Sequence, residues 1–332
     1  MTYRIQASAP RARQAQGTAS FSGSLRTEEF WSHATAPVAL VVLTIGFTIA
    51  TPRFITWGNL TGMLSDAAIP AILALGSTFA VALAGIDLSL AANLALSSVV
   101  MGAAYQAGWP LWLSALTAIG TGLAVGAVNG VFIGRVRIPD FIVTLGSLSL
   151  LMGLSLILSN GTPVTMEIPS LTAISTDSFL GIRYDFILVI AMAIILHVIL
   201  FNTRFGTHLL AVGDNREAAR AMGLRVARVK LAGYMICGLM GGIGAVFLIS
   251  YVGASTPTTN TNYLLNAIAA VVLGGVSLFG GKATIIGPIL GAVLLTFLQD
   301  GLTMLGVSDY YSPFVIGIVV IAAATLMRGR TS

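Results

Sequence analysis

Long apolar runs recur from residue 34 almost to the end of the chain, and short polar segments separate them. A helix needs about 20 apolar residues to cross the ~30 Å hydrocarbon core of a bilayer. Charged residues make up only 9% of the chain, against about 25% in an average soluble domain. We therefore expect an all-α, polytopic membrane protein with about ten transmembrane helices. The predicted spans are residues 34–51, 62–84, 89–107, 111–134, 141–159, 184–201, 231–252, 263–280, 284–303 and 311–327.

The basic residues predict the orientation of these spans, because cytoplasmic loops of membrane proteins retain Lys and Arg. Ten spans place both termini on one side. Fifteen of the 17 Lys and Arg residues fall on that side, and Arg53 and Arg183 fall on the other. Both termini are therefore expected in the cytoplasm, with residues 1–33 as a disordered tail and residues 34–328 as the transmembrane domain. The net charge of +5 follows from this orientation and does not indicate nucleic-acid binding.

Residues 202–230 form the longest charged segment between apolar runs, so this segment must face water. Residues 214–223 within it are typical of a short helix with signals at both ends. Asp214 is the expected N-cap, Glu217 follows three residues later as in a capping box, and Gly223 suits the left-handed C-terminal position. The segment contains six basic residues: Arg204, Arg216, Arg220, Arg225, Arg228 and Lys230.

This expected helix would carry a small apolar face made of Ala218, Ala221 and Met222. An apolar face on a short helix in water indicates that something covers it. The residues leave three possibilities open: the inner surface of the helix bundle, anionic lipid, and a cytoplasmic protein subunit. Arg225, Arg228 and Lys230, which follow, are expected to hold the inner end of the next span in the cytoplasm.

The stretch AGIDLSLAAN, at residues 84–93, places polar side chains between two apolar runs with almost no loop. Backbone groups in such a reversal need internal partners near a membrane. Gly85 would relax the dihedral constraint, and Asp87 or Ser89 could cap the following helix. The stretch is therefore either a capped tight turn or a part of a transport path or subunit contact.

Glycines recur every fourth residue in the predicted span at 111–134. Since this spacing aligns them on one helix face, the stripe predicts that another backbone packs closely against it. The members of this stripe are Gly122, Gly126, Gly130 and Gly134.

The chemistry within the spans is mostly uncharged. Asn93, Asn129 and Asn266 could line a path for a polar solute, and each could equally donate a hydrogen bond between helices. Ionisable groups lie near span ends, which disfavours a proton-driven carrier and places the energy source elsewhere. The three histidines are far apart and Cys237 is the only cysteine. We therefore expect no catalytic residue, no metal and no cofactor in this chain.

Four segments in order resemble the permeases of ribose-type monosaccharide ABC importers, a family that also includes branched-chain amino acid permeases. They are AGIDLSLAAN, RIPDFIVTLGSLSLLMGLSLIL, TRFGTHLLAVGDNREAARAMGL and LNAIAAVVLGGVSLFGGKATIIGPILGAVLL. The resemblance implies a homodimer of ten-helix subunits in the bacterial inner membrane, in contact with lipid. It also implies a separate cytoplasmic ATP-binding subunit, an extracytoplasmic sugar-binding protein and a small polar substrate.

The resemblance further implies that the charged segment contains a coupling helix that docks the ATPase. The residues that would inherit this role are Asp214, Asn215, Glu217, Ala218, Arg220 and Gly223. The chain would then be a permease subunit and not an enzyme. Two alternatives stay open: the same architecture for a nucleoside, a sugar-like signal or an amino acid, and a secondary carrier or channel without an ATPase.

Overall fold

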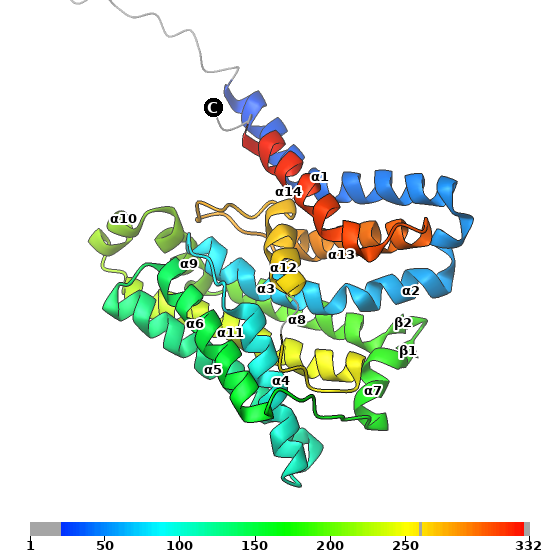
Figure 1. Cartoon of the computed structure of the whole chain (residues 1–332). Helices are drawn as coiled ribbons and strands as arrows, with labels where there is room; N and C mark the ends of the chain where they lie inside the picture. Colours follow the sequence, from blue (N-terminus) through cyan, green and yellow to red (C-terminus); the bar gives the residue numbers. More distant parts are fainter. Residues whose placement is uncertain (1–20, 259–260, 329–332) are drawn as a thin grey trace, which may run out of the picture.

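The computed structural model describes residues 21–258 and 261–328, and these residues fold into a bundle of helices (Figure 1). Five helices of the described part are long and apolar enough to cross a membrane. A sixth candidate is the pair α2 (Trp57–Asp66) and α3 (Ala68–Ala82), which is bent by 40°. The five are α5 (Leu111–Val131) with its π-helical extension η2 (Phe132–Val136), α6 (Asp140–Ser159), α8 (Tyr184–Phe201), α11 (Val226–Val252) and α13 (Ile286–Met304). The helical, multi-pass prediction is confirmed, while the count of ten stays a prediction.

The other predicted spans coincide with helices whose bounds differ from those expected. Helix α1 begins at Phe21, so residues 21–33, which were predicted to belong to a disordered tail, are helical and that prediction is wrong for them. Residues 1–20 lie outside the described part of the chain. The run predicted at 263–280 stops being helical at Leu273, since Gly275, Gly280 and Gly281 adopt positive φ angles that end regular helix. These helices are α1 (Phe21–Ala50), α4 (Leu90–Gln106), α12 (Thr261–Leu273) and α14 (Ser312–Arg328).

Helix α11 forms the centre of the bundle, where α3, α4 and α5 pack against it (Figure 1). Every residue of α3 is buried. Small side chains allow this, because they let backbones approach where the hydrophobic effect between apolar helices in lipid is weak. The largest fully buried side chain of the described residues is Tyr234 of α11.

The glycine stripe packs directly against another backbone, as predicted, and that backbone belongs to α11. A Cβ atom added at Gly122 would lie 2.7 Å from the Cα atom of Gly242, and one added at Gly130 would lie 2.8 Å from the Cα atom of Leu231. On the facing helix, a Cβ atom added at Gly238 would lie 2.7 Å from the Cα atom of Gly126. Each distance is shorter than real side chains show, so the two helices touch backbone to backbone.

The segment between α6 and α8 folds onto one end of α11. It contains α7 (Pro169–Thr176) and a two-stranded antiparallel pair, β1 (Ser178–Phe179) and β2 (Ile182–Arg183). Ser175 Oγ donates to the carbonyl oxygen of Ser250 at 2.8 Å, and Ser250 Oγ donates to that of Leu171 at 2.8 Å. Two 3₁₀ turns, η1 (Pro52–Ile55) and η3 (Asp309–Tyr311), precede α2 and α14.

Candidate functional site

The charged segment folds as two helices, α9 (Arg204–Asp214) and α10 (Arg216–Ala221), with Asn215 between them. The N-cap predicted at Asp214 is wrong, because Asp214 is the last residue of α9. Asn215 has an extended backbone and its Oδ1 accepts the amide hydrogens of Glu217 at 3.0 Å and Ala218 at 2.9 Å. Gly223 has φ 82° and ends the segment in the left-handed conformation, as predicted.

Helix α10 lies at one edge of the molecule beside α9 (Figure 1). Ala219 is buried against the bundle, whereas Ala218 and Ala221 are exposed and the side chain of Met222 is 70% exposed. The apolar face expected from the sequence therefore exists, and the described residues of the chain leave it open. Of the three covers that the sequence left open, the described part of the bundle does not supply one.

Backbone contacts join this segment to the turn that follows α3. Gly213 packs against the carbonyl oxygen of Ala82, which also accepts the amide hydrogen of Gly281 at 3.1 Å. Arg216 Nη2 donates to the carbonyl oxygen of Leu83 at 3.4 Å. The end of α9, the end of α3 and the loop after α12 therefore meet at one junction.

The turn itself is closed by Asp87, whose Oδ1 accepts the amide hydrogen of Ser89 at 2.9 Å and its hydroxyl at 2.6 Å. Burial raises the pKa of Asp87, while the two bonds from Ser89 act in the opposite direction. The role predicted for Gly85 is wrong, because the positive φ angle of the turn belongs to Ala84, at 55°. Gly85 is needed for space instead: an added Cβ atom would collide with the Asp140 carboxylate and the Tyr234 hydroxyl.

A chain of buried and partly buried hydrogen bonds leads from this turn across α5 to α6. Asn129 Nδ2 donates to Ser89 Oγ at 2.9 Å, and Ser147 Oγ donates to Asn129 Oδ1 at 2.5 Å. Asn129 has no exposed surface. The chain ties the turn to two membrane-length helices, so a movement of the turn would reach both.

The other two predicted path residues lie apart from this chain. Asn93 Nδ2 donates to the carbonyl oxygen of Gly238 at 3.1 Å, and Asn93 Oδ1 accepts from Ser97 at 3.2 Å. Asn266 lies on α12 and is 8% exposed. Asn93 and Asn129 therefore bond helices to one another in this conformation.

Sequence reasoning missed an ion pair at the end of the charged segment. Lys230 Nζ lies 3.3 Å from Asp140 Oδ1, and the Tyr234 hydroxyl donates to Asp140 Oδ2 at 3.0 Å. Lys230 is only 5% exposed, so its side chain is buried in this ion pair, and its role in holding the inner end of α11 in the cytoplasm stays a prediction. The spacing of Lys230 and Tyr234 by one helical turn was the available signal, because it places both on one face.

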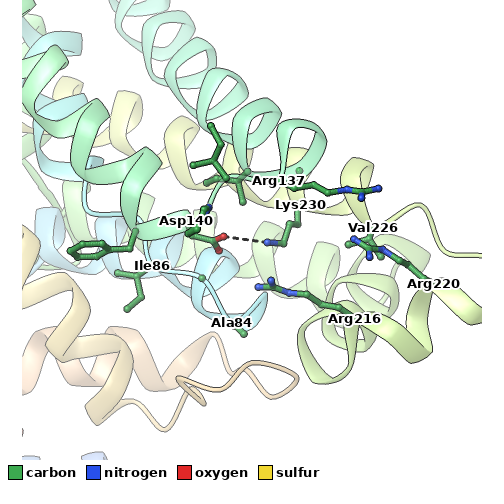
Figure 2. A pocket seen from close by; sticks show the side chains of 14 residues that line it. Ala84, Ile86, Arg137, Asp140, Arg216, Arg220, Val226 and Lys230 are labelled. Atoms are coloured by element: carbon green, nitrogen blue, oxygen red, sulfur yellow. Dashed lines mark hydrogen bonds and ion pairs between the residues drawn. The ribbon is translucent and has the colours of Figure 1, made fainter.

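The ion pair lines a pocket of about 500 Å³ between the turn, the start of α6, α10 and the start of α11 (Figure 2). Three arginines share this lining: Arg137, Arg216 and Arg220. Such a pocket can hold an anion. Among the described residues, no group of three His, Cys, Asp or Glu side chains is placed to bind a metal ion.

Comparison with known proteins shows the family to which this chain belongs. Residues 59–324 match the family described as the permease component of branched-chain amino acid transport systems. The chain is 34% identical over 294 residues to the ribose import permease protein RbsC of Escherichia coli K12, covering 86% of this chain and 90% of the relative. It is 35% identical over 293 residues to the L-arabinose ABC transporter permease protein AraH of Azospirillum brasilense, covering 88% and 86%.

A third relative, the autoinducer 2 import system permease protein LsrC of Salmonella typhi, is 32% identical over 288 residues, which cover 87% of this chain and 83% of the relative. Permeases of this family are membrane subunits of transporters rather than enzymes, and the family implies ATP-binding and substrate-binding partners. The chain therefore belongs to this permease family, as a ribose-type sugar ABC permease that crosses the bacterial inner membrane several times.

Proposed function

We propose that this chain forms the translocation path of an ATP-driven importer for a monosaccharide or a similar small polar solute. The relatives named for ribose and L-arabinose support a sugar. The observation that carries the ATP-driven part is α10: its apolar face is open, and α9, which precedes it, is joined by backbone contacts to the turn after α3. A short helix built in this way is suited to receive a force from outside the membrane.

The proposed assembly is a homodimer of ten-helix subunits with cytoplasmic termini, a separate ATP-binding subunit and an extracytoplasmic sugar-binding protein. The basic residues of the loops support this orientation. Helix α6 supports contact with lipid or a second copy, because only 11% of its span is buried and side chains such as Leu150 and Ile157 are exposed.

The docking residues we propose are Asp214, Asn215, Glu217, Ala218, Arg220 and Gly223. Movement of α10 would act on Leu83 through the hydrogen bond of Arg216, and the adjoining end of α9 would press on Ala82 through Gly213. The turn would pass this movement to α5 and α6 through the bonds of Asn129. ATP binding and hydrolysis in the partner would thereby shift the chain between two conformations.

The substrate would pass close to Asn93, Asn129 and Asn266, once a second conformation frees the amide groups of Asn93 and Asn129, which are bonded to protein here. An alternative is the same architecture for a nucleoside, an amino acid or a sugar-like signal, and the relative named for autoinducer 2 favours the last. A ligand screen on the cognate binding protein tests these against one another.

Reconstitution separates the ATP-driven importer from a carrier or channel that works without an ATPase. The permease is placed in liposomes with its binding protein, with and without the ATPase, and uptake of labelled sugar is followed. We expect uptake only with the ATPase and ATP. Uptake at the same rate without ATP would refute the proposal.

Docking through α10 is tested by Glu217→Lys. Glu217 is exposed and its side chain supports no part of the described fold, so we expect normal insertion but loss of ATPase co-purification and of coupled hydrolysis. Glu167→Lys is the matched control, since it makes the same charge change at an exposed residue of the segment between α6 and α8. Normal ATPase binding by Glu217→Lys would remove the docking assignment.

A further inference from the structure

The pocket beside the docking segment is assembled from four separate parts of the chain. Its walls come from the turn at residues 84–86, the loop and start of α6 at 133–141, one face of α10, and Val226 and Lys230 of α11. Its volume of about 500 Å³ lies in the range of sites that hold a small molecule or a headgroup. The pocket is therefore large enough for more than a solvent ion.

The charge of this pocket is strongly one-sided. Its lining contains four basic side chains and a single acid, Asp140, which is already bonded to Lys230 and Tyr234. Figure 2 shows Arg137, Arg216 and Arg220 around that pair. A guanidinium offers five N–H donors, and the one bond described for Arg216, to the carbonyl of Leu83, uses a single nitrogen. Most of this donor capacity remains available for an anion with several acceptor oxygens.

The backbone at Arg137 supports a role for its side chain. Arg137 has φ 66° and ψ 30°, a left-handed conformation that favours glycine or asparagine and is costly for arginine. The backbone conformation alone gives no reason for a basic residue at this position. An arginine held there against its own preference points to a function for its guanidinium group.

Exposed apolar side chains of α6 lie next to the pocket. Phe141 lines the pocket and is 57% exposed, and Ile142 and Leu145 follow it on α6 with 59% and 44% exposed. A ligand that carries a phosphate on an acyl glycerol would place the phosphate among the arginines and its chains along this face of α6. A free phosphate or a soluble phosphate ester would fill only the charged part of the pocket and make no contact with this face of α6.

We propose that this pocket binds the phosphodiester headgroup of an anionic phospholipid from the cytoplasmic leaflet. Basic pockets between helices on this side of a membrane are suited to such headgroups. Arg137 and Arg216 hold the phosphate oxygens, and the bound lipid links the start of α6 to α10. The inference rests on the proposed orientation but not on the ATPase, so its test uses the permease alone.

The test counts lipids that stay bound to the purified full-length chain by native mass spectrometry. Anionic phosphatidylglycerol is compared with zwitterionic phosphatidylethanolamine at equal concentrations. Arg137→Gly removes one charge and suits the left-handed backbone, so it keeps the fold, and Arg216→Gln removes a second. Arg228→Gln is the control, because Arg228 is an exposed basic residue at the start of α11 outside the pocket.

We expect phosphatidylglycerol to be retained in preference to phosphatidylethanolamine, and each pocket variant to lower its affinity about fivefold. The control is expected to stay within about twofold of the parent, because screened surface charge acts weakly over distance. Equal losses in the control and the pocket variants would overturn the proposal, since they would show only general surface attraction.

Two further arms separate the sources of phosphate. Millimolar inorganic phosphate or glycerol phosphate should leave the bound lipid in place; displacement by either would assign the pocket to a soluble anion instead. Addition of the partner ATPase should also leave the lipid bound. Stoichiometric release of lipid by the ATPase would show that the pocket belongs to the protein interface, and would overturn the lipid assignment without affecting the import role.

Discussion

Replacing Gly122 with alanine should force α5 and α11 apart. The added Cβ atom would lie 2.7 Å from the Cα atom of Gly242 and 2.6 Å from its backbone nitrogen, and the carbonyl oxygen of Gly238 is closer still. Ordinary contacts of a Cβ atom begin at 3.4 Å, so the facing backbone must withdraw by about 0.7 Å or more. No side chain can rotate away, because all three obstacles are main-chain atoms.

The cost of this substitution follows from the nature of the contact. Overpacking a close-packed interior usually costs about 1–3 kcal/mol, and a rigid backbone neighbour places this site near the upper end. Separation also weakens the neighbouring contacts of Gly126 and Gly130, since dispersion attraction falls steeply with distance. We therefore expect Gly122→Ala to lower the free energy of unfolding by about 2–3 kcal/mol.

The matched control is Gly120→Ala, on the same helix two residues earlier. A Cβ atom added there meets no atom within 4 Å, so this change should be neutral or stabilise the helix by up to about 1 kcal/mol. Both variants are unfolded by SDS titration in mixed micelles and followed by tryptophan fluorescence. Equal midpoints for the two variants would refute the close-packed α5–α11 contact.

Three further perturbations address the polar groups. Lys230→Met should lower the free energy of unfolding by about 2–3 kcal/mol in the same titration, because it leaves the Asp140 carboxylate without its cation. Adding Asp140→Asn to this variant should recover part of the loss. A double variant with no recovery would show that the charge pair is unimportant for stability. Asn129→Leu should lower the free energy of unfolding by about 1–3 kcal/mol, because it leaves buried polar groups without a hydrogen bond, and Ser147→Ala, at a partly exposed position, should lower it less. The reverse order of melting temperatures would contradict the hydrogen-bond chain. Asn215→Ala should weaken α10 by about 1 kcal/mol and speed hydrogen exchange at the amides of Glu217 and Ala218, while Asp214→Ala should leave both rates nearly unchanged, and similar effects of the two would reject Asn215 as the cap.

The sequence predicted features that depend on local or periodic patterns. The glycine spacing of α5 indicated close backbone packing, because residues four apart share a helix face. It could not identify α11 as the partner, since that choice depends on residues more than a hundred positions later. The left-handed end at Gly223 was also predictable, because it depends on that residue alone.

The errors arose where tertiary contacts decide between neighbouring residues. Asp214 and Asn215 are both good caps, and the continuation of α9 through Asp214 leaves the position to Asn215. Lys230 was predicted as a cytoplasmic anchor, but the sequence did not show its ion pair with Asp140, which lies 90 positions earlier. Gly85 showed a need for glycine without showing that the reason is the approach of Asp140 and Tyr234.

The junction of Gly213, Ala82 and Gly281 limits how such permeases can exchange parts. The two glycines approach main-chain atoms so closely that a side chain on either one would collide with them. The fit therefore depends on the backbone conformation of all three segments. A chimera that takes only residues 202–230 from a relative with a different ATPase would bring one of the three contacting segments. The other two, which contain Ala82 and Gly281, would not match it. Specificity for the ATPase should therefore transfer only when residues 82–89 and 274–282 are exchanged together with residues 202–230. These three segments are the smallest unit that can be exchanged between such permeases.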